Sequence, residues 1–470
     1  MKTEDGKTGF RLITSTSINT GMAGVSPEKL IETDLKEGQE IKLIASGEEG
    51  VTRIIRRKMK KRTLTETEIE TFISALDYGI LTNSHIAAFG TAIEINGMHE
   101  KEITAVAESI IRHSKIMTHK GKEMVVDKHS IGGIAGNRIT PLMIPIISSA
   151  GFKIPKVSTR AITSPAGTVD ALEVVCPMDL TFEEALDVVD QTGACMVNGE
   201  TVGLGAVMDK FLSVVKQIKV DPKEMMIASI LAKKKAAGSQ FVMIDLPTGR
   251  GSKLPLREDA RRLAYDFSSI GNKLGLKVEC IISPGDKPIG NMIGPALEMT
   301  EVLRILQGER GSLSLVRKAL SMSGLILEGC GAANRGEGYE IASQILSSGK
   351  AFNKFKEIIE AQGGDPSVSW DSIPVAPYSH IIKAERSDIV YTLDSENIGI
   401  MARAAGAPHD KMAGVILHVD RGDEIKKGDP IIEIRAHSEG KLSDAIAIMQ
   451  TTPPITLERS VLEHITGMQS

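Results

Sequence analysis

The chain has 470 residues, with 56 Lys and Arg against 60 Asp and Glu and a net charge of −4. At about 150 residues per domain, this length predicts roughly three domains, and hydrophobic (41%) and charged (25%) shares in the ordinary range exclude a disordered or fibrous chain. The charge balance lacks the basic excess of a nucleic-acid-binding protein, and apolar runs such as 142–150 are too short to cross a bilayer. We therefore expect a cytoplasmic protein without nucleic-acid or membrane partners.

The composition pairs 45 Gly with only 10 Phe, 5 Tyr and 1 Trp, which favours close backbone turns over stacking surfaces. The cysteines are far apart and form no CxxC pair, and the ten histidines show no HExxH spacing. These patterns predict neither a disulfide framework nor a metal site, and we expect no cofactor. The four cysteines are Cys176, Cys195, Cys280 and Cys330.

The first 118 residues divide into two predicted parts. Residues 1–50 are predicted to form a small β-rich extension, with a candidate strand at 10–13 and a turn that leads into a strand over 35–44. A basic run over 53–62 then introduces a helical domain, 51–118. Within it, Thr65 to Glu68 is a capping box ahead of apolar residues at helical spacing, and the same spacing recurs over 86–93 and 103–110. The sequence therefore predicts three short helices here.

From residue 119 the pattern changes to short strands that alternate with helices, which predicts an α/β domain over 119–374. Each strand is followed by a loop rich in Gly, Ser or Pro, and ligand sites gather in such loops. A helical stretch, 206–237, interrupts the alternation and is assigned to the helical domain. Residues 375–470 are strand-rich again and predict a C-terminal α+β domain. The predicted strands are 124–126, 156–158, 241–244 and 278–283.

The strongest local motif is the loop 127–137, which contains Lys128, Ser130, Gly132 and Gly133. Glycines let backbone N–H groups converge on an anion, and a lysine and a hydroxyl add a cation and a donor. This pattern is compatible with phosphate, although a glycine turn taken alone more often serves only loop packing.

A second hydroxyl-rich loop, 158–168, follows the next strand and can face the first across the sheet. Taken alone, Ser158, Thr159 and Thr168 are as well explained as caps of helices and turns. Two such loops in succession favour binding of a small anion or a sugar phosphate.

Two further features carry weaker signals. Asp221 and Pro222 read first of all as the start of a helix, on which Ser229 and its small neighbours could admit a ligand. The segment 245–253 ends in Gly-Arg-Gly-Ser-Lys and could hold an anion through Lys253, although a solvated basic loop is the commoner outcome.

These motifs resemble the thymidine and pyrimidine nucleoside phosphorylase family, and most closely its archaeal branch, the AMP phosphorylases. The resemblance covers about residues 51–470. It implies a helical domain, an α/β phosphate-binding domain and a C-terminal α+β domain, and a homodimer or larger homo-oligomer. The matching motifs are Lys128-His129-Ser130 with Gly132-Gly133, the loop 158–168, the segments 228–234 and 286–290, and the segment 403–408.

The resemblance also implies roles for individual residues. Asp221 would donate a proton. Inorganic phosphate would be held by Lys128, Ser130, Ser158 and Thr168. The nucleotide would be bound by Gly133, Thr159, Arg160, Ala161, Ile162, Thr163, Ser164, Thr168, Ser229 and Lys253. The resemblance leaves open whether Ser229 and Lys253 contact the base or the 5′-phosphate.

The implied reaction converts AMP and phosphate to ribose 1,5-bisphosphate and adenine, with CMP and UMP as further candidate substrates. Two alternatives stay open: a phosphorylase of unphosphorylated thymidine or uridine, and a non-catalytic nucleotide-binding protein. Val214 stands where the thymidine enzymes place a base-binding arginine, which argues against thymidine. Lys128, Ser130 and Asp221 together argue against a pure binding protein, because binding needs no general acid. The extension 1–50 is shorter than is usual in the AMP branch.

Overall fold

The computed structural model describes residues 2–3, 24–25, 36, 43–44, 48–161 and 164–458. They form two compact units. The first holds the described residues up to Ile116 together with Leu204–Ala236, and the second holds Met117–Gly203 and the described residues from Ala237 onward. No helix in the described part of the chain is long and apolar enough to span a membrane.

The first unit is helical apart from one short antiparallel strand pair. The predicted strand at 10–13 lies outside the described residues, as does most of 35–44. Helices α3, α4 and α5 stand where the apolar spacing predicts them. The bounds are β1 Lys2–Thr3, β2 Leu43–Ile44, α2 Glu48–Met59, α3 Glu66–Asp77, α4 Asn83–Asn96, α5 Glu100–Arg112, α10 Val207–Gln217 and α11 Lys223–Ala236.

Helix α3 shows why these segments fold locally. The Thr65 hydroxyl accepts the backbone N–H of Glu68 at 3.2 Å, and the Glu68 carboxylate accepts that of Thr65 at 3.0 Å. This reciprocal cap satisfies two donors that the first helical turn leaves without partners. The apolar stripe of the helix is buried, and Phe72 stacks on Phe89 of α4. The capping box predicted from sequence is thus confirmed.

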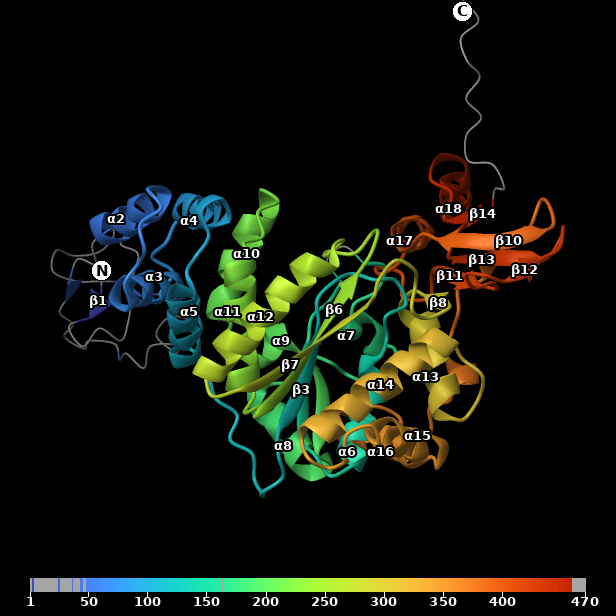
Figure 1. Ribbon diagram of the computed structural model, residues 1–470, viewed down its shortest axis with the longest axis horizontal. Coiled ribbons are helices and arrows are strands. Elements are labelled where there is room, and N and C mark those ends of the chain that lie inside the picture. The colour runs from blue at the N-terminus through green and yellow to red at the C-terminus, as the bar shows by residue number, and fades with distance from the viewer. Residues whose placement is uncertain are drawn as a thin grey trace, which may run out of the picture. The chain divides into compact units, whose positions relative to one another are not determined.

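The second unit is built on parallel strands. Strand β6 lies between β3 and β7 (Figure 1). Strand β4 pairs with β5. A parallel bridge from Val125 to Lys153 joins the two ladders, so that their carboxyl ends meet at one edge. The bounds are β3 Val126–Ser130, β4 Ile154–Ser158, β5 Ala194–Asn198, β6 Phe241–Thr248 and β7 Lys277–Pro284.

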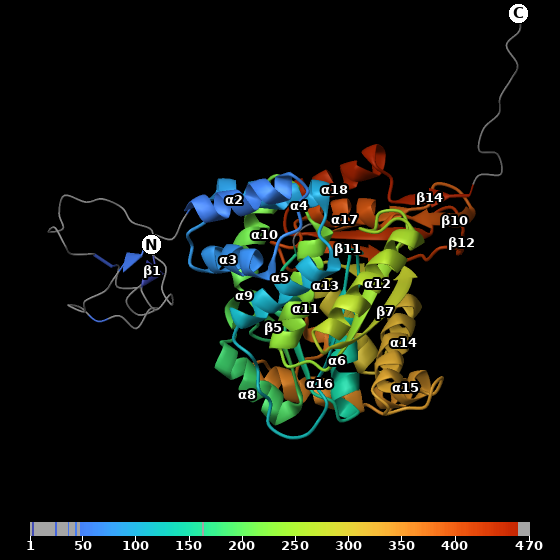
Figure 2. The ribbon, with the colours of Figure 1, turned by 60° about the vertical axis from the view of Figure 1, so that its left-hand side comes forward.

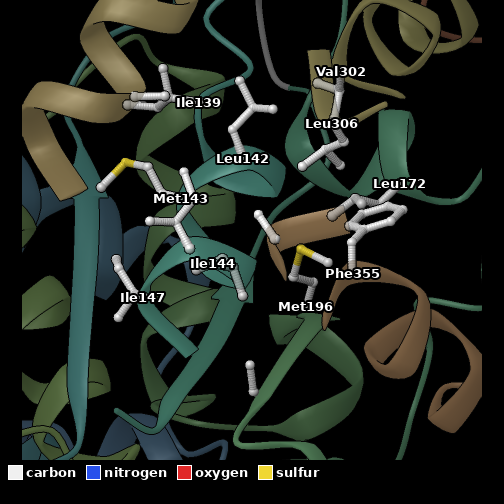
Figure 3. Packing of buried hydrophobic residues seen from close by; sticks show 14 of the residues in the cluster. Ile139, Leu142, Met143, Ile144, Ile147, Leu172, Met196, Val302, Leu306 and Phe355 are labelled. Atoms are coloured by element: carbon white, nitrogen blue, oxygen red, sulfur yellow. The ribbon is translucent and has the colours of Figure 1, made fainter. Parts of the chain in front are cut away.

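Helices pack around this sheet, with α12 against β7 and α14 against both α15 and α6 (Figure 2). Helix α6 is apolar on every side, as expected of a helix enclosed in a core. Its Leu142, Met143 and Ile147 belong to the large cluster drawn in Figure 3. The bounds are α6 Thr140–Ser149, α7 Thr168–Leu172, α8 Phe182–Thr192, α9 Gly199–Val202, α12 Arg257–Lys273, α13 Pro295–Leu306, α14 Leu313–Gly329, α15 Gly338–Ser347, α16 Lys350–Ala361 and the 3₁₀ helix η1 Trp370–Ser372.

The C-terminal part of the second unit has a core of its own. Its main sheet, in the order β8-β11-β13-β9, is antiparallel and includes β8, which the chain forms directly after β7. This shared strand joins the C-terminal part to the α/β part. The bounds are β8 Met292–Ile293, β9 Tyr378–Lys383, β10 Asp388–Leu393, α17 Ser395–Ala405, β11 Gly414–Leu417, β12 Glu424–Ile425, β13 Pro430–Ala436, α18 Glu439–Thr451 and β14 Ile455–Leu457.

The predicted fold class, a helical, an α/β and a C-terminal α+β part, is confirmed, but strand bounds differ from the sequence reading. Strand β3 begins later and runs through Ser130, so that Lys128 stands on a strand and not in a loop. Strand β6 runs to Thr248 and therefore includes Asp245. The reason is pairing: Lys128 lies opposite Met243 and Ser130 opposite Asp245 in the parallel ladder, which keeps polar residues in extended backbone.

Candidate active site

The loops that follow β3 and β4 meet at the carboxyl edge of the sheet. Arg138, at the end of the first loop, donates to the Thr168 hydroxyl at 3.0 Å and to the Ala166 carbonyl at 2.9 Å in the second. Its Nε donates to buried Glu298 at 2.5 Å. Arg138 is buried. Because its guanidinium belongs to the end of the first loop and donates to two groups of the second, it holds the two loops together.

The first loop is also tied to the segment that follows β7. Gly136 has φ +65°, and a Cβ there would lie 2.9 Å from the backbone of Gly290. The Gly290 N–H donates to the Gly136 carbonyl at 3.0 Å, and the Ala135 N–H donates to the Ser395 hydroxyl of α17 at 3.0 Å. A glycine is required at position 136 because only it allows this close approach and this backbone conformation.

The second loop is closed by Asp170, which is buried at the start of α7. Its carboxylate accepts the N–H groups of Ala161 at 2.7 Å and Gly167 at 2.8 Å. A Cβ at Gly167 would lie 2.4 Å from the Ala161 nitrogen, so no side chain fits there. The sequence thus folds this stretch into a tight turn that directs Ser158 and Thr168 to the same edge of the sheet.

Lys128 is the central charge of this edge and is only 4% exposed. Among the described residues, its ammonium has one hydrogen-bond partner, the Ser130 hydroxyl at 3.5 Å, and no carboxylate within ion-pair distance. Burial lowers its pKa to about 7, against the attraction of Asp245 and with further lowering by Lys318 and Arg138. A buried ammonium without a counter-ion is costly, so this position favours an incoming anion.

The carboxylates around Lys128 are each next to another cation. Asp245 lies 2.8 Å from the Lys318 ammonium. Glu298 accepts from Arg138, and Asp127 lies 3.8 Å from the Lys156 ammonium. Burial raises the pKa of Glu298, although Arg138 opposes that rise. The edge therefore carries local positive charge.

Three buried polar atoms at this edge have no hydrogen-bond partner among the described residues: Ser158 Oγ, Asn137 Oδ1 and Asp245 Oδ2, the last of which is ion-paired with Lys318. An unsatisfied buried polar group costs about 1–3 kcal/mol, which a ligand that pairs with it recovers. The Thr168 hydroxyl already accepts from Arg138, so its own hydrogen can point to a ligand. The Ser158 and Thr168 hydroxyls and the Lys128 ammonium can therefore donate to a small oxyanion, whereas Asn137 Oδ1 can only accept from a donor such as a hydroxyl group.

Comparisons with known proteins identify the parts of the chain. Residues 52–114 match the helical bundle domain of the glycosyl transferase family, and residues 122–352 match its a/b domain. Residues 389–456 match the pyrimidine nucleoside phosphorylase C-terminal domain. An anthranilate phosphoribosyltransferase from Thermus thermophilus shares the fold, with a TM-score of 0.55 and 16% identity over 66% of this chain and 99% of that one.

Full-length relatives decide the family. An AMP phosphorylase of Pyrococcus furiosus is 42% identical over 96% of this chain and 90% of its own length. Those of Thermococcus kodakarensis and Methanosarcina barkeri are both 40% identical, over 96% and 88% of this chain and 90% and 82% of their own lengths. This chain belongs to the AMP phosphorylase family. The resemblance read from its motifs is confirmed, and the chain is an enzyme of the pentosyltransferase kind.

In this AMP phosphorylase family member, the predicted phosphate residues lie on two neighbouring strands and the start of α7. Lys128 and Ser130 end β3, Ser158 ends β4, and Thr168 begins α7. Gly133 is exposed in the first loop. Their roles remain predictions.

The predicted nucleotide residues are more scattered. Thr159, Ala161 and Ser164 lie in the second loop, and Ile162 and Thr163 fall outside the described residues. Lys253 is exposed after β6. Ser229 is buried on α11 of the first unit.

The Arg160 side chain is ion-paired with acidic side chains. Its guanidinium donates to both oxygens of Glu173 at 2.7 and 2.8 Å and to Asp179 at 3.2 Å. The Arg160 hydrogen bonds, supported by Lys411, lower the pKa of Glu173 to about 2. If Arg160 contacts a nucleotide, it would therefore do so through its backbone atoms.

Asp221, the predicted proton donor, lies two residues before α11 and is exposed. A carboxyl group that donates a proton near neutrality needs its pKa raised by burial. The structure leaves Asp221 exposed, so it does not itself supply that burial, and the proton-donor role stays a prediction.

Sequence reasoning missed Arg138, which ties the two loops together. Asn137 closes the glycine-rich motif, and Arg138 follows it directly. The available signal was a polar pair just before an all-apolar helix, α6, where a charged residue is expected only if its partners are buried with it.

Proposed function

We propose that this protein is a nucleoside 5′-monophosphate phosphorylase that converts AMP and inorganic phosphate to ribose 1,5-bisphosphate and adenine. CMP and UMP are further candidate substrates. The observation that carries the proposal is Lys128, a buried ammonium with no carboxylate partner among the described residues. Such a cation gains most from an anion that arrives with the substrates. The relatives named AMP phosphorylase support the choice of substrate.

In the proposed reaction, a phosphate oxygen forms a bond to C1′ of the ribose while the bond from C1′ to the base nitrogen breaks. The electron pair of that bond leaves with the base, which takes up a proton. The sugar passes through an oxocarbenium-like state, so a phosphate held at fixed distance on its open face supplies both position and charge. Lys128, Ser130, Ser158 and Thr168 would hold that phosphate, and no resident cofactor is required.

The direct test is to incubate the protein with AMP and inorganic phosphate and to measure free adenine. Phosphate-dependent release of adenine is the expected result. Thymidine in the same assay separates the proposal from a nucleoside phosphorylase. AMP binding without any base release from AMP, CMP or UMP would refute the proposal in favour of a binding protein.

The role of Asp221 has its own test. Asp221→Asn is expected to retain AMP affinity and to lose about 10²–10⁴-fold in turnover, the usual contribution of a general acid. Asp187→Asn, which changes another exposed carboxylate, serves as the control. Unchanged turnover in Asp221→Asn would leave this residue as part of the helix start only.

A homodimer or larger homo-oligomer is implied by the family and is part of the proposal. Light scattering of the purified protein would measure its mass in solution.

A further inference from the structure

The side chains of Lys318, Asp245 and Ser283 form a closed group, and the charges of Lys318 and Asp245 both act on the pKa of Lys128. The Lys318 ammonium, on α14, lies 2.8 Å from Asp245 Oδ2 and donates to Ser283 Oγ at 3.0 Å. Ser283 Oγ in turn donates to Asp245 Oδ1 at 2.5 Å. Asp245 is fully buried, and the Lys318 side chain is 9% exposed. Asp245 Oδ1 thus accepts from Ser283, and Oδ2 is ion-paired with Lys318 although it accepts no hydrogen bond among the described residues.

Asp245 is the carboxylate best placed to capture Lys128. It stands opposite Ser130 in the β3–β6 ladder, two positions along from Lys128. Of the charges that act on Lys128, that of Asp245 has the largest effect on its pKa. The other charged groups facing Lys128 are Lys318 from α14, Arg138 from the first loop and Asp127 from β3 itself.

Lys318 and Lys128 thus compete for one carboxylate. A buried ammonium that gained Asp245 as counter-ion would have little reason to bind an anion, because pairing would already offset its desolvation. Lys318 takes the carboxylate with an ion pair and a bridging hydroxyl, an arrangement that leaves Lys128 without such a partner.

We propose that Lys318 is a positioning residue of the phosphate site: it holds Asp245 and so keeps the Lys128 ammonium available to the oxygens of inorganic phosphate. This inference rests on the proposed function, in which Lys128 binds phosphate. Lys318 itself need not touch the substrate.

The test is Lys318→Met, which keeps the length of the side chain and removes its charge. Asp245 then turns to Lys128, so the KM for phosphate in adenine release and the dissociation constant of phosphate by calorimetry should both rise by roughly 10- to 100-fold, the range for a charged hydrogen bond. The value of kcat should change less. Lys318→Arg should restore affinity, and Arg317→Met, an exposed charge on the same helix, should leave it unchanged.

A double variant separates positioning from mere support of the fold. Asp245→Asn with Lys318→Met removes both the carboxylate and its cation, so Lys128 is again without a counter-ion and phosphate affinity should return to within about threefold of wild type. A structural role predicts instead that the two losses add. Should Lys318→Met fail to fold, the double variant still decides.

Two results overturn the inference: an unchanged phosphate affinity in Lys318→Met, or a double variant that binds phosphate as weakly as Lys318→Met. A wild-type protein that binds phosphate but releases no base refutes the proposed function. In that case the calorimetric comparison still tests Lys318.

Discussion

Two buried lysines, one in each unit, differ in whether their ammonium group has a carboxylate partner among the described residues. Lys58 is 3% exposed and Lys128 is 4% exposed. The Lys58 ammonium lies 2.8 Å from Glu102, whose carboxylate also accepts the N–H groups of Leu64 at 2.9 Å and His99 at 2.8 Å. Lys128 has only the distant Ser130 hydroxyl among the described residues. A fully paired buried charge serves the architecture, whereas an unpaired one marks a place for a ligand.

Lys58→Met should have the largest effect, because it tests whether the Lys58–Glu102 pair stabilises the fold. It leaves Glu102 buried without its cation, so the free energy of unfolding should fall by about 3–5 kcal/mol. Urea denaturation measures the change. Lys60→Met, an exposed lysine just beyond the same helix, should stay within about 0.5 kcal/mol of wild type. A loss below about 1 kcal/mol in Lys58→Met would contradict the architectural role.

Lys128→Met should lower activity without lowering stability. Removal of one charge aimed at the reacting phosphate should lower kcat/KM for phosphate by about 10²–10³-fold. The melting temperature should stay level or rise, because an unpaired buried charge is removed. Adenine release and thermal melts measure both, with exposed Lys122→Met as the control. A fall in melting temperature as large as that of Lys58→Met would show that Lys128 is also architectural.

The anion affinity of the Lys128 site should also depend on pH. Burial lowers the pKa of Lys128 to about 7, so in the free protein its ammonium loses the proton as the pH rises above that value. Affinity for an anion should then be level below pH 7 and fall by up to about tenfold per pH unit above it. Inorganic phosphate titrates in the same range, so sulfate, whose charge is constant there, is the better probe as a competitive inhibitor. A sulfate inhibition constant that stays level up to pH 9 would contradict this prediction.

The smallest effect concerns a half-exposed cluster in the first unit. In its charged form His113 donates from Nδ1 to Asp77 at 2.9 Å and from Nε2 to Glu70 at 3.0 Å, and the hydrogen bond to Asp77 raises the pKa of His113 against the effect of burial. Because the folded pKa is raised, this stabilisation is fully present below the unfolded pKa and is lost as pH rises through the folded one.

The expected loss between pH 5.5 and 8.5 is about 1 kcal/mol or less, since solvent screens the cluster. Urea denaturation of wild type and His113→Gln at both pH values measures it. The free energy of unfolding of the variant should depend less on pH than that of wild type. An equal pH dependence in both proteins would show that His113 does not contribute to it.

Local signals predicted much of the fold. The capping box at Thr65 and the apolar stripe of α3 involve residues at most a few positions apart, and the structure confirms both. The alternation of strands and helices correctly gave the α/β class. Strand ends were less accurate: β3 reaches Ser130 because it pairs with β6, a partner more than 100 residues away that local composition does not reveal.

The site was predictable in part for the same reason. Glycines and hydroxyls near Lys128 and Ser158 indicated anion binding because two such loops follow successive strands, although either loop taken alone is equally well explained by packing or capping. Arg138 was missed, since its partners Thr168 and Glu298 are 30 and 160 residues distant. The assigned ligand roles, including those of Asp221 and Lys253, stay predictions.

Short-range spacing and residue type were enough to predict the helical periods, the capping box at Thr65, the two glycine- and hydroxyl-rich turns and the family. Only the tertiary structure decided which charges are paired. Asp245 could neutralise either Lys128 or Lys318, and nothing in their spacing along the chain chooses between them. The choice is made by the packing of α14 against β6, which brings the Lys318 ammonium to 2.8 Å from Asp245 and leaves Lys128 without a carboxylate partner among the described residues.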